Sequence, residues 1–192
     1  MGSVDIANRA LTRVGAGRIT SFGDDNEEAK SMSEIYEGCR LGMLRSHPWN
    51  FAVGRQRLAL LAEDPLMEFP FQYALPDDYV RLIELWTGDA AMAKNLVRER
   101  RQWQIEGKKL LTEFQNVSIR YIKDVEEFDA SFEEAFVAQL AYELSYTFQS
   151  SPGMQDRIYN LFQAKLGEAK QVDMLENQFN VRHGDQLDIV RY

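Results

Sequence analysis

The sequence predicts an α+β protein that is mainly α, with an antiparallel four-helix bundle and a β-rich insertion between helices 2 and 3. Three observations support this fold class. Apolar residues recur at helical spacing towards both ends of the 192-residue chain, alternate with polar residues after Pro48, and return to helical spacing at Ser131. The expected organisation is a helical bundle of residues 1–48 and 125–178, a β-rich insertion of residues 49–124, and a C-terminal arm of residues 179–192.

The first two helices are indicated by apolar residues at three- and four-residue steps. Val4, Ala7, Leu11 and Val14 share one face of the first helix. A glycine-containing loop, VGAGRITSFGDD, follows it. The acidic residues at the end of this loop are typical of a helix start, where carboxylates meet the positive end of the helix dipole. The second helix must end near His47, because a proline disfavours the helical conformation in the residue before it.

The residues after Pro48 alternate between apolar and polar, which predicts strands. Trp49, Phe51 and Val53 begin the first strand, and an aromatic- and proline-rich connection, DPLMEFPFQYALPDDY, follows. YVRLIELW and VSIRYIKDV predict two further strands, and WQIEGKKLLTE predicts a hairpin that turns at Glu106-Gly107-Lys108. We therefore expect four or five strands in the insertion.

Two more helices are predicted after Ser131. Phe132, Phe136, Leu140 and Leu144 form an apolar stripe, and alanines make much of the remaining circumference apolar as well. A helix of this kind is typically buried at the centre of a helical assembly. A short QSSPG turn leads to a long amphipathic helix, and the last dozen residues show no clear period.

The composition argues against several classes of protein. The formal net charge of -8 is opposite to the basic excess of a general nucleic-acid binder. A single cysteine, Cys39, excludes an intrachain disulfide, and its apolar neighbours indicate a packing role. No apolar run approaches the roughly 20 residues of a membrane-spanning helix, so we expect no membrane partner.

The polar residues predict no catalytic, cofactor-binding or metal-binding site. His47 and His183 lie outside the ligand spacings of zinc proteins, and the chain has neither a nucleophile elbow nor a phosphate-binding loop. Two facing carboxylates can hydrolyse a sugar bond, but adjacent carboxylates at helix starts are usually solvated partners of the helix dipole. The acidic pairs in question are Asp24/Asp25, Glu27/Glu28, Asp77/Asp78, Glu126/Glu127 and Glu133/Glu134.

One basic patch stands out in the acidic chain. It can contact phosphates, or it can be a charged strand edge that resists aggregation. A third alternative is contact with the acidic stretch Asp124–Glu134 of a like subunit, since complementary patches on different faces are what a head-to-tail ring requires. The candidate subunit or partner contacts are Arg98, Arg100, Arg101, Trp103, Lys108 and Lys109, with Lys94 nearby.

Several short motifs occur in a specific order and are followed by a late pair of helices, a pattern that covers roughly residues 4–178. The stretches are NRALTRVG, GDDNEEA, LRSHPWNFAVGRQRLAL and YALPDDYVRLIEL, and the most specific patterns within them are W-x-F-A-x-x-R-x-x-L and L-P-x-D-Y/L. This order resembles the tail tubular protein A family, the head-to-tail adaptor (connector) proteins of short-tailed bacteriophages and related prophages. The motif residues that match, and that we interpret as structural, are Pro48, Trp49, Phe51, Arg55, Leu75, Pro76, Asp78 and Tyr79.

The resemblance implies a structural, non-enzymatic virion protein of the phage neck or tail, made in the host cytoplasm. Such adaptors form a twelve-subunit homo-oligomeric ring between the portal protein and the tail nozzle protein, although an isolated subunit can remain a monomer. The ring extends the channel through which DNA passes during ejection without specific binding, and an acidic wall fits that role. Some related adaptors have been credited with peptidoglycan hydrolysis, so a tail-associated peptidoglycan hydrolase is the alternative. A DNA-binding module that uses the basic patch is a third hypothesis.

Overall fold

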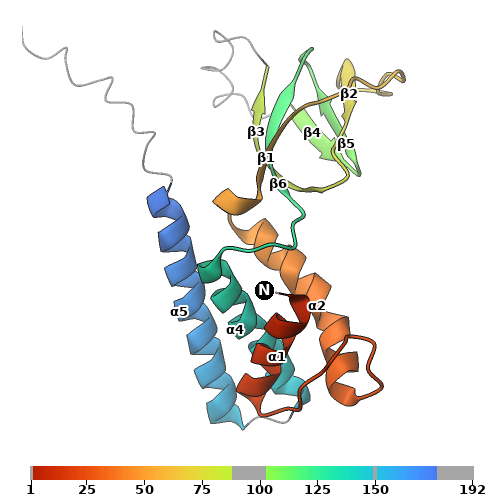
Figure 1. Cartoon of the computed structure of the whole chain (residues 1–192). Coiled ribbons are helices and arrows are strands. Elements are labelled where there is room, and N and C mark those ends of the chain that lie inside the picture. Colours follow the sequence, from red (N-terminus) through yellow and green to blue (C-terminus); the bar gives the residue numbers. More distant parts are fainter. Residues whose placement is uncertain (1, 88–102, 149–150, 177–192) are drawn as a thin grey trace, which may run out of the picture. The chain divides into compact units, whose positions relative to one another are not determined.

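The computed structural model describes residues 2–87, 103–148 and 151–176, and the chain divides into two compact units. One unit contains Met1–Cys39 and Phe128–Tyr192, and the other contains Arg40–Glu127 (Figure 1). The division therefore falls inside the second helix, before the expected boundary at residue 48. The expected C-terminal arm, residues 179–192, lies outside the described residues.

The predicted fold class, a mainly α protein built on an antiparallel four-helix bundle, is wrong. The described residues contain four α-helices and two three-stranded antiparallel sheets, which is an α+β fold with a sheet-rich unit of its own. The physical reason lies in two segments. The prolines on both sides of residues 71–74 favour a connection, yet these residues pair with β5 in a sheet. The last residues of the second helix also belong to the β-rich unit.

The helical unit is organised around α4 (Ala130–Thr147). This helix packs against both α1 (Ser3–Val14) and α5 (Pro152–Glu176), as Figure 1 shows. The first part of α2 (Glu27–Ser46) joins α4 through an edge-to-face contact of Tyr36 with Phe136, whose ring centroids are 5.3 Å apart. The expectation that the apolar helix after Ser131 is buried is confirmed. Its buried apolar side chains are Phe132, Ala135, Phe136, Val137, Ala138, Leu140, Ala141 and Leu144.

The loop between α1 and α2 is held by side-chain hydrogen bonds. The Asn8 amide donates to the Ile19 carbonyl at 2.9 Å and accepts from the Ile19 backbone N–H at 2.8 Å. Asp24 accepts from amide groups within the loop, and these bonds lower its pKa. Asn26 caps α2 by accepting from the Ala29 N–H at 2.8 Å. The acidic run therefore organises the loop, while an amide side chain provides the cap.

The β-rich unit consists of two antiparallel sheets that share one apolar cluster. Sheet A has the order β1 (Val53–Arg57), β6 (Ser118–Lys123), β3 (Tyr79–Trp86), and sheet B has the order β2 (Phe71–Ala74), β5 (Lys109–Thr112), β4 (Trp103–Glu106). The buried cluster draws on both sheets and contains Leu58, Tyr73, Leu75, Leu85, Leu110, Val117, Ile119 and Tyr121.

The structure confirms the predicted hairpin and changes the predicted start of the first strand. Strands β4 and β5 pair around a turn in which Gly107 has a φ of 58°, a left-handed conformation that favours glycine. Residues Asn50–Ala52 form a short 3-10 helix, η1, so β1 begins at Val53 instead of Trp49. The described residues hold six strands, because β2 was not predicted.

We expect Gly54→Ala to destabilise the β-rich unit by about 1–3 kcal/mol through overpacking. A Cβ at this position would lie 2.9 Å from Cε1 of Tyr121 and 2.8 Å from Cγ of Lys123. Gly38→Ala in α2 is the matched control, because nothing lies within 4 Å of its added Cβ. The control should gain about 0.5–1 kcal/mol from better helix propensity. Urea unfolding measures both variants, and a shift of the same sign in the two would contradict the packing argument.

Candidate interaction surface

The W-x-F-A-x-x-R-x-x-L motif, which starts at Trp49, lies just after the end of α2. Trp49 is almost fully buried, and its Nε1–H donates to the Met43 carbonyl at 2.8 Å. The His47 ring meets the Trp49 ring edge to face at a centroid distance of 4.7 Å, and Phe51 lies on it at 6.2 Å. α2 ends at Ser46, as the proline at position 48 predicts. Trp49 therefore satisfies a helix-end carbonyl, and His47 packs beside it.

The L-P-x-D-Y motif, Leu75–Tyr79, fixes the start of β3 against β6. The Tyr121 hydroxyl donates to Asp78 Oδ1 at 2.9 Å, and the Tyr79 hydroxyl accepts from the Leu82 N–H at 2.7 Å. The rings of Tyr79 and Tyr121 stack at a centroid distance of 6.0 Å. Burial, followed by the hydrogen bond to Asp78, raises the pKa of Tyr121 to about 12. Leu75 belongs to the apolar cluster of the unit.

Several of the acidic candidates take part in internal contacts. Glu133 and Glu134 of α4 both pair with Arg9 of α1, and Arg13 adds a contact to Glu134 at 3.0 Å. Asp124 pairs with Arg40 inside the β-rich unit. Three carboxylates of the acidic stretch Asp124–Glu134, those of Asp124, Glu133 and Glu134, are thus paired within the chain.

Cys39 lies in α2 and is partly buried. Burial, with a smaller effect from the Glu143 carboxylate, raises the pKa of its thiol to about 11. The thiol is therefore protonated at neutral pH, and a protonated thiol is a poor nucleophile.

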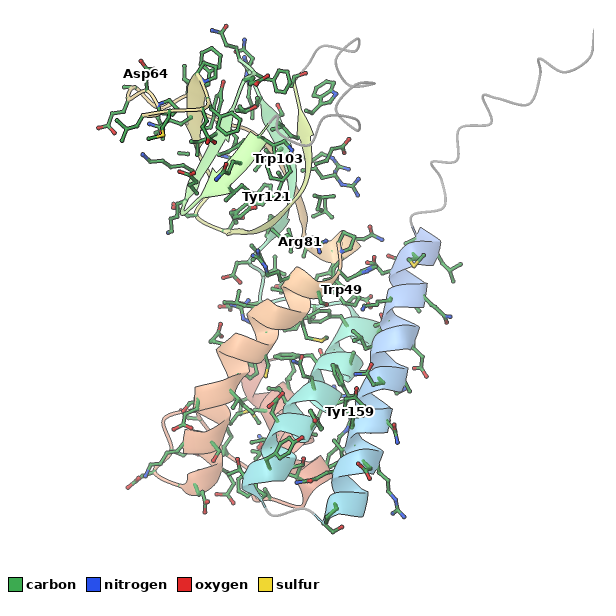
Figure 2. All side chains as sticks on the ribbon, turned by 180° about the vertical axis from the view of Figure 1, so that it is seen from behind. Trp49, Asp64, Arg81, Trp103, Tyr121 and Tyr159 are labelled. Carbon is green, nitrogen blue, oxygen red and sulfur yellow. The ribbon has the colours of Figure 1, made fainter. Side chains whose placement is uncertain are left out.

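The predicted basic patch is only partly described. Arg98, Arg100 and Arg101 lie outside the described residues. Trp103, Lys108 and Lys109 lie on the β4–β5 hairpin, and all three are exposed. Figure 2 labels Trp103. Trp103 stands at the far end of the hairpin from the lysines, opposite Thr112. The hairpin thus presents one large aromatic ring and two ammonium groups to solvent.

A second basic surface lies on sheet A, and sequence reasoning did not find it as a group. Arg55 of β1 is directly opposite Arg120 of β6, which is opposite Glu84 of β3. Residues directly opposite in antiparallel strands project from the same face of the sheet. Ile119 and Tyr121, the neighbours of Arg120, enter the apolar cluster on the other face. The resulting arginine face consists of Arg55, Arg57, Glu84, Trp86, Ser118 and Arg120.

The arginine face lines a hollow of about 490 Å³. Trp86 is 53% exposed there, and Arg57 Nη2 donates to Asn116 Oδ1 at 2.8 Å. Nε of Arg120 is buried, and it has no hydrogen-bond partner within the described part of the chain. Three arginines face one glutamate, so the hollow carries excess positive charge. Such a surface can bind carboxylates or phosphates, because a guanidinium group matches both in geometry.

The signal for this face was only partly present in the sequence. Arg55 and Arg57 stand two residues apart in a strand, so they project to one side. The addition of Arg120 and Glu84 requires the register of β1, β6 and β3, which short alternating strands do not specify on their own.

Comparisons with known proteins add no family. No protein-family model matches the chain, and no curated protein sequence matches it. None of the helices in the described ranges is both long enough and apolar enough to span a membrane. Among the described residues, no cluster of three or more His, Cys, Asp or Glu side chains is arranged to hold a metal ion.

We expect Tyr121→Phe to lower stability by about 0.5–1.5 kcal/mol at neutral pH, through loss of the bond to Asp78. The raised pKa of Tyr121 also means that stability is lost as pH rises from about 10 to about 12, since ionisation is less favourable in the folded state. Tyr121→Phe should flatten this alkaline loss, measured by denaturant unfolding across the range. An alkaline loss as steep in Tyr121→Phe as in the unchanged protein would contradict the assignment to Tyr121.

Arg55→Thr should stabilise the fold by about 0.2–1 kcal/mol, because it removes a like charge directly opposite Arg120. Arg57→Thr is the matched control: Arg57 lies opposite Ser118 and loses a hydrogen bond to Asn116 when replaced. Denaturant unfolding at low and high salt separates the two, since salt screens only the first effect. Destabilisation by Arg55→Thr at low salt would contradict the repulsion.

Proposed function

We propose that the protein is a structural head-to-tail adaptor of a phage virion, which forms a ring between the portal and the tail nozzle and extends the DNA channel. The observation that carries the proposal is the ordered pair of motifs, W-x-F-A-x-x-R-x-x-L followed by L-P-x-D-Y/L. Trp49, Asp78 and Tyr79 of these motifs make hydrogen bonds that fix the β-rich unit. The motif residues with these bonds have a structural role, which fits a structural protein better than an enzyme.

The exposed side chains support a role in assembly. α5 presents large apolar residues to solvent along its outer side, including Met174 at 60% and Leu175 at 61% exposure. The β-rich unit exposes Trp86 and Trp103. Large apolar residues at a surface are typical of protein–protein contacts. A ring subunit needs such surfaces for its neighbours, the portal and the nozzle.

The charge of the chain supports passage of DNA without capture. The formal net charge is -8, and phosphate binding depends on an excess of Lys and Arg. In the proposed ring, the acidic character repels the DNA backbone and allows it to slide.

The decisive experiment mixes the full chain with purified portal rings and examines the mixture by electron microscopy. We expect a second ring of adaptor density on one end of the portal. Trp49→Ala, which removes the bond to the Met43 carbonyl and the buried ring, should weaken or abolish ring formation. Absence of binding at every salt and protein concentration would refute the proposal.

Zymography on peptidoglycan, with the same purified protein, tests the alternative function, a tail-associated peptidoglycan hydrolase. The adaptor proposal expects no cleared zone. Clearing that disappears after a single Glu→Gln or Asp→Asn change would establish the hydrolase instead, since such enzymes depend on a specific carboxylate.

A further inference from the structure

An acidic loop with an apolar tip projects from the β-rich unit. The acidic loop is Glu63–Glu68, with the sequence EDPLME. Leu66 is 99% exposed and Met67 is 76% exposed, and the three carboxylates of the loop flank them. The loop and sheet B line a common hollow, and Figure 2 labels Asp64 on the loop. Two large apolar side chains are thus held in water among negative charges.

The acidic loop is fixed by its neighbours. Gln72 of β2 donates from its side-chain amide to the Glu63 carbonyl at 2.6 Å, and the Phe69 N–H donates to the Met67 carbonyl at 2.9 Å. Glu68 has a φ of 68°, a left-handed conformation that is unfavourable for a residue with a long side chain. Strained backbone that the surroundings hold in place is found most often at binding sites. These contacts hold the loop in a conformation that exposes Leu66 and Met67.

The arginine face complements the acidic loop in charge and in character. It carries three arginines against one glutamate, while the loop carries three carboxylates. Trp86 is half exposed in the hollow and offers an aromatic surface for Leu66 or Met67. A methionine thioether makes favourable contacts with aromatic rings. Carboxylates would pair with the exposed guanidinium groups of Arg55 and Arg57.

The acidic loop and the arginine face do not contact each other within one copy of the chain. Leu66 is almost fully exposed, so it does not occupy the hollow of its own chain. The acidic loop lines a hollow with sheet B, whereas the arginine face belongs to sheet A, and the two hollows share no lining residue. A contact between different surfaces of two identical chains is heterologous, and its repetition generates a ring or a filament.

We propose that the acidic loop of one copy seats in the arginine face of a second copy, with its carboxylates on Arg55, Arg57 and Arg120 and its apolar tip on Trp86. This inference deepens the proposed function, on which it rests for closure of the contacts into a ring. DNA phosphates would also suit the arginines. They would leave the apolar tip of the acidic loop without a partner, so a second copy fits more of the observations.

Disulfide trapping tests the contact in the full chain. Two proteins are made in a Cys39→Ser background: one carries Leu66→Cys, and the other carries Ser118→Cys in the arginine face. After mixing and oxidation, we expect the mixed dimer to exceed either homodimer by at least about tenfold, because docking raises the effective concentration of only that thiol pair. Equal yields of the three dimers, or no mixed dimer, would overturn the proposal.

Charge reversal provides the matched control. Arg55→Glu with Arg120→Glu in the Ser118→Cys protein should lower the mixed-dimer yield by about tenfold or more. Glu63→Lys with Asp64→Lys in the Leu66→Cys protein should restore it. Glu126→Lys with Glu127→Lys, the same charge change at exposed positions elsewhere in the unit, should not. The proposal would also be overturned if Glu126→Lys with Glu127→Lys restored the mixed-dimer yield. An unchanged mixed-dimer yield after Arg55→Glu with Arg120→Glu would overturn it as well.

Three further results distinguish the self-contact from DNA binding at the arginine face and from the adaptor role. Binding of a labelled DNA oligonucleotide that blocks the trapping and is lost in Arg55→Glu with Arg120→Glu would assign the arginine face to nucleic acid and overturn the self-contact. Rings on portals without the mixed disulfide would leave the adaptor role standing and refute the loop contact. A specific mixed disulfide without portal binding would refute the adaptor role and support the loop contact.

Discussion

Strand β6 is hydrogen-bonded to β1 on one side and to β3 on the other. The β-rich unit depends on the alternation of inward apolar and outward charged side chains along this strand. Ile119 and Tyr121 project into the apolar cluster, while Arg120 projects from the opposite face between Arg55 and Glu84. A register slip of one residue would place Arg120 in the core and two apolar side chains in water. The same constraint therefore defines the packed interior and the charged surface. The bond between Tyr121 and Asp78 holds this strand against the start of β3.

The helices could be predicted from sequence because their signals are local. The stripe through Phe132, Phe136 and Leu140 and the stop before Pro48 both depend on residues a few positions apart. Strand β2 could not be predicted in this way, because it is four residues long and is stabilised by pairing with β5, far along the chain. The alternation of Trp49, Phe51 and Val53 was misleading, since Trp49 is fixed by the Met43 carbonyl and a 3-10 turn follows it.

The surface was predicted less well than the core, and the reason is also physical. A basic patch that is continuous in sequence can be recognised by inspection, as the run from Arg98 to Lys109 was. The arginine face is assembled from three strands, so it exists only once the register is known. The resemblance to the adaptor family drew attention to Arg55 as a motif residue. It did not reveal the like-charged residue opposite it.

Several local features of the β-rich unit oppose its own stability. Arg55 faces Arg120, Glu68 adopts a left-handed conformation, and Leu66 is surrounded by water. Natural sequences keep such conflicts mainly where function requires them. All three belong to the acidic loop or the arginine face.

The separation of the acidic loop from the arginine face has a consequence for mixed populations. A subunit with two different and complementary ends behaves like a bifunctional monomer in a polymerisation. A subunit that retains one end and lacks the other acts as a chain stopper: it joins a growing arc and prevents the next addition. Under the proposed pairing, a small fraction of such subunits would block many complete rings, so damage to either surface would be dominant in a cell that also makes the intact protein.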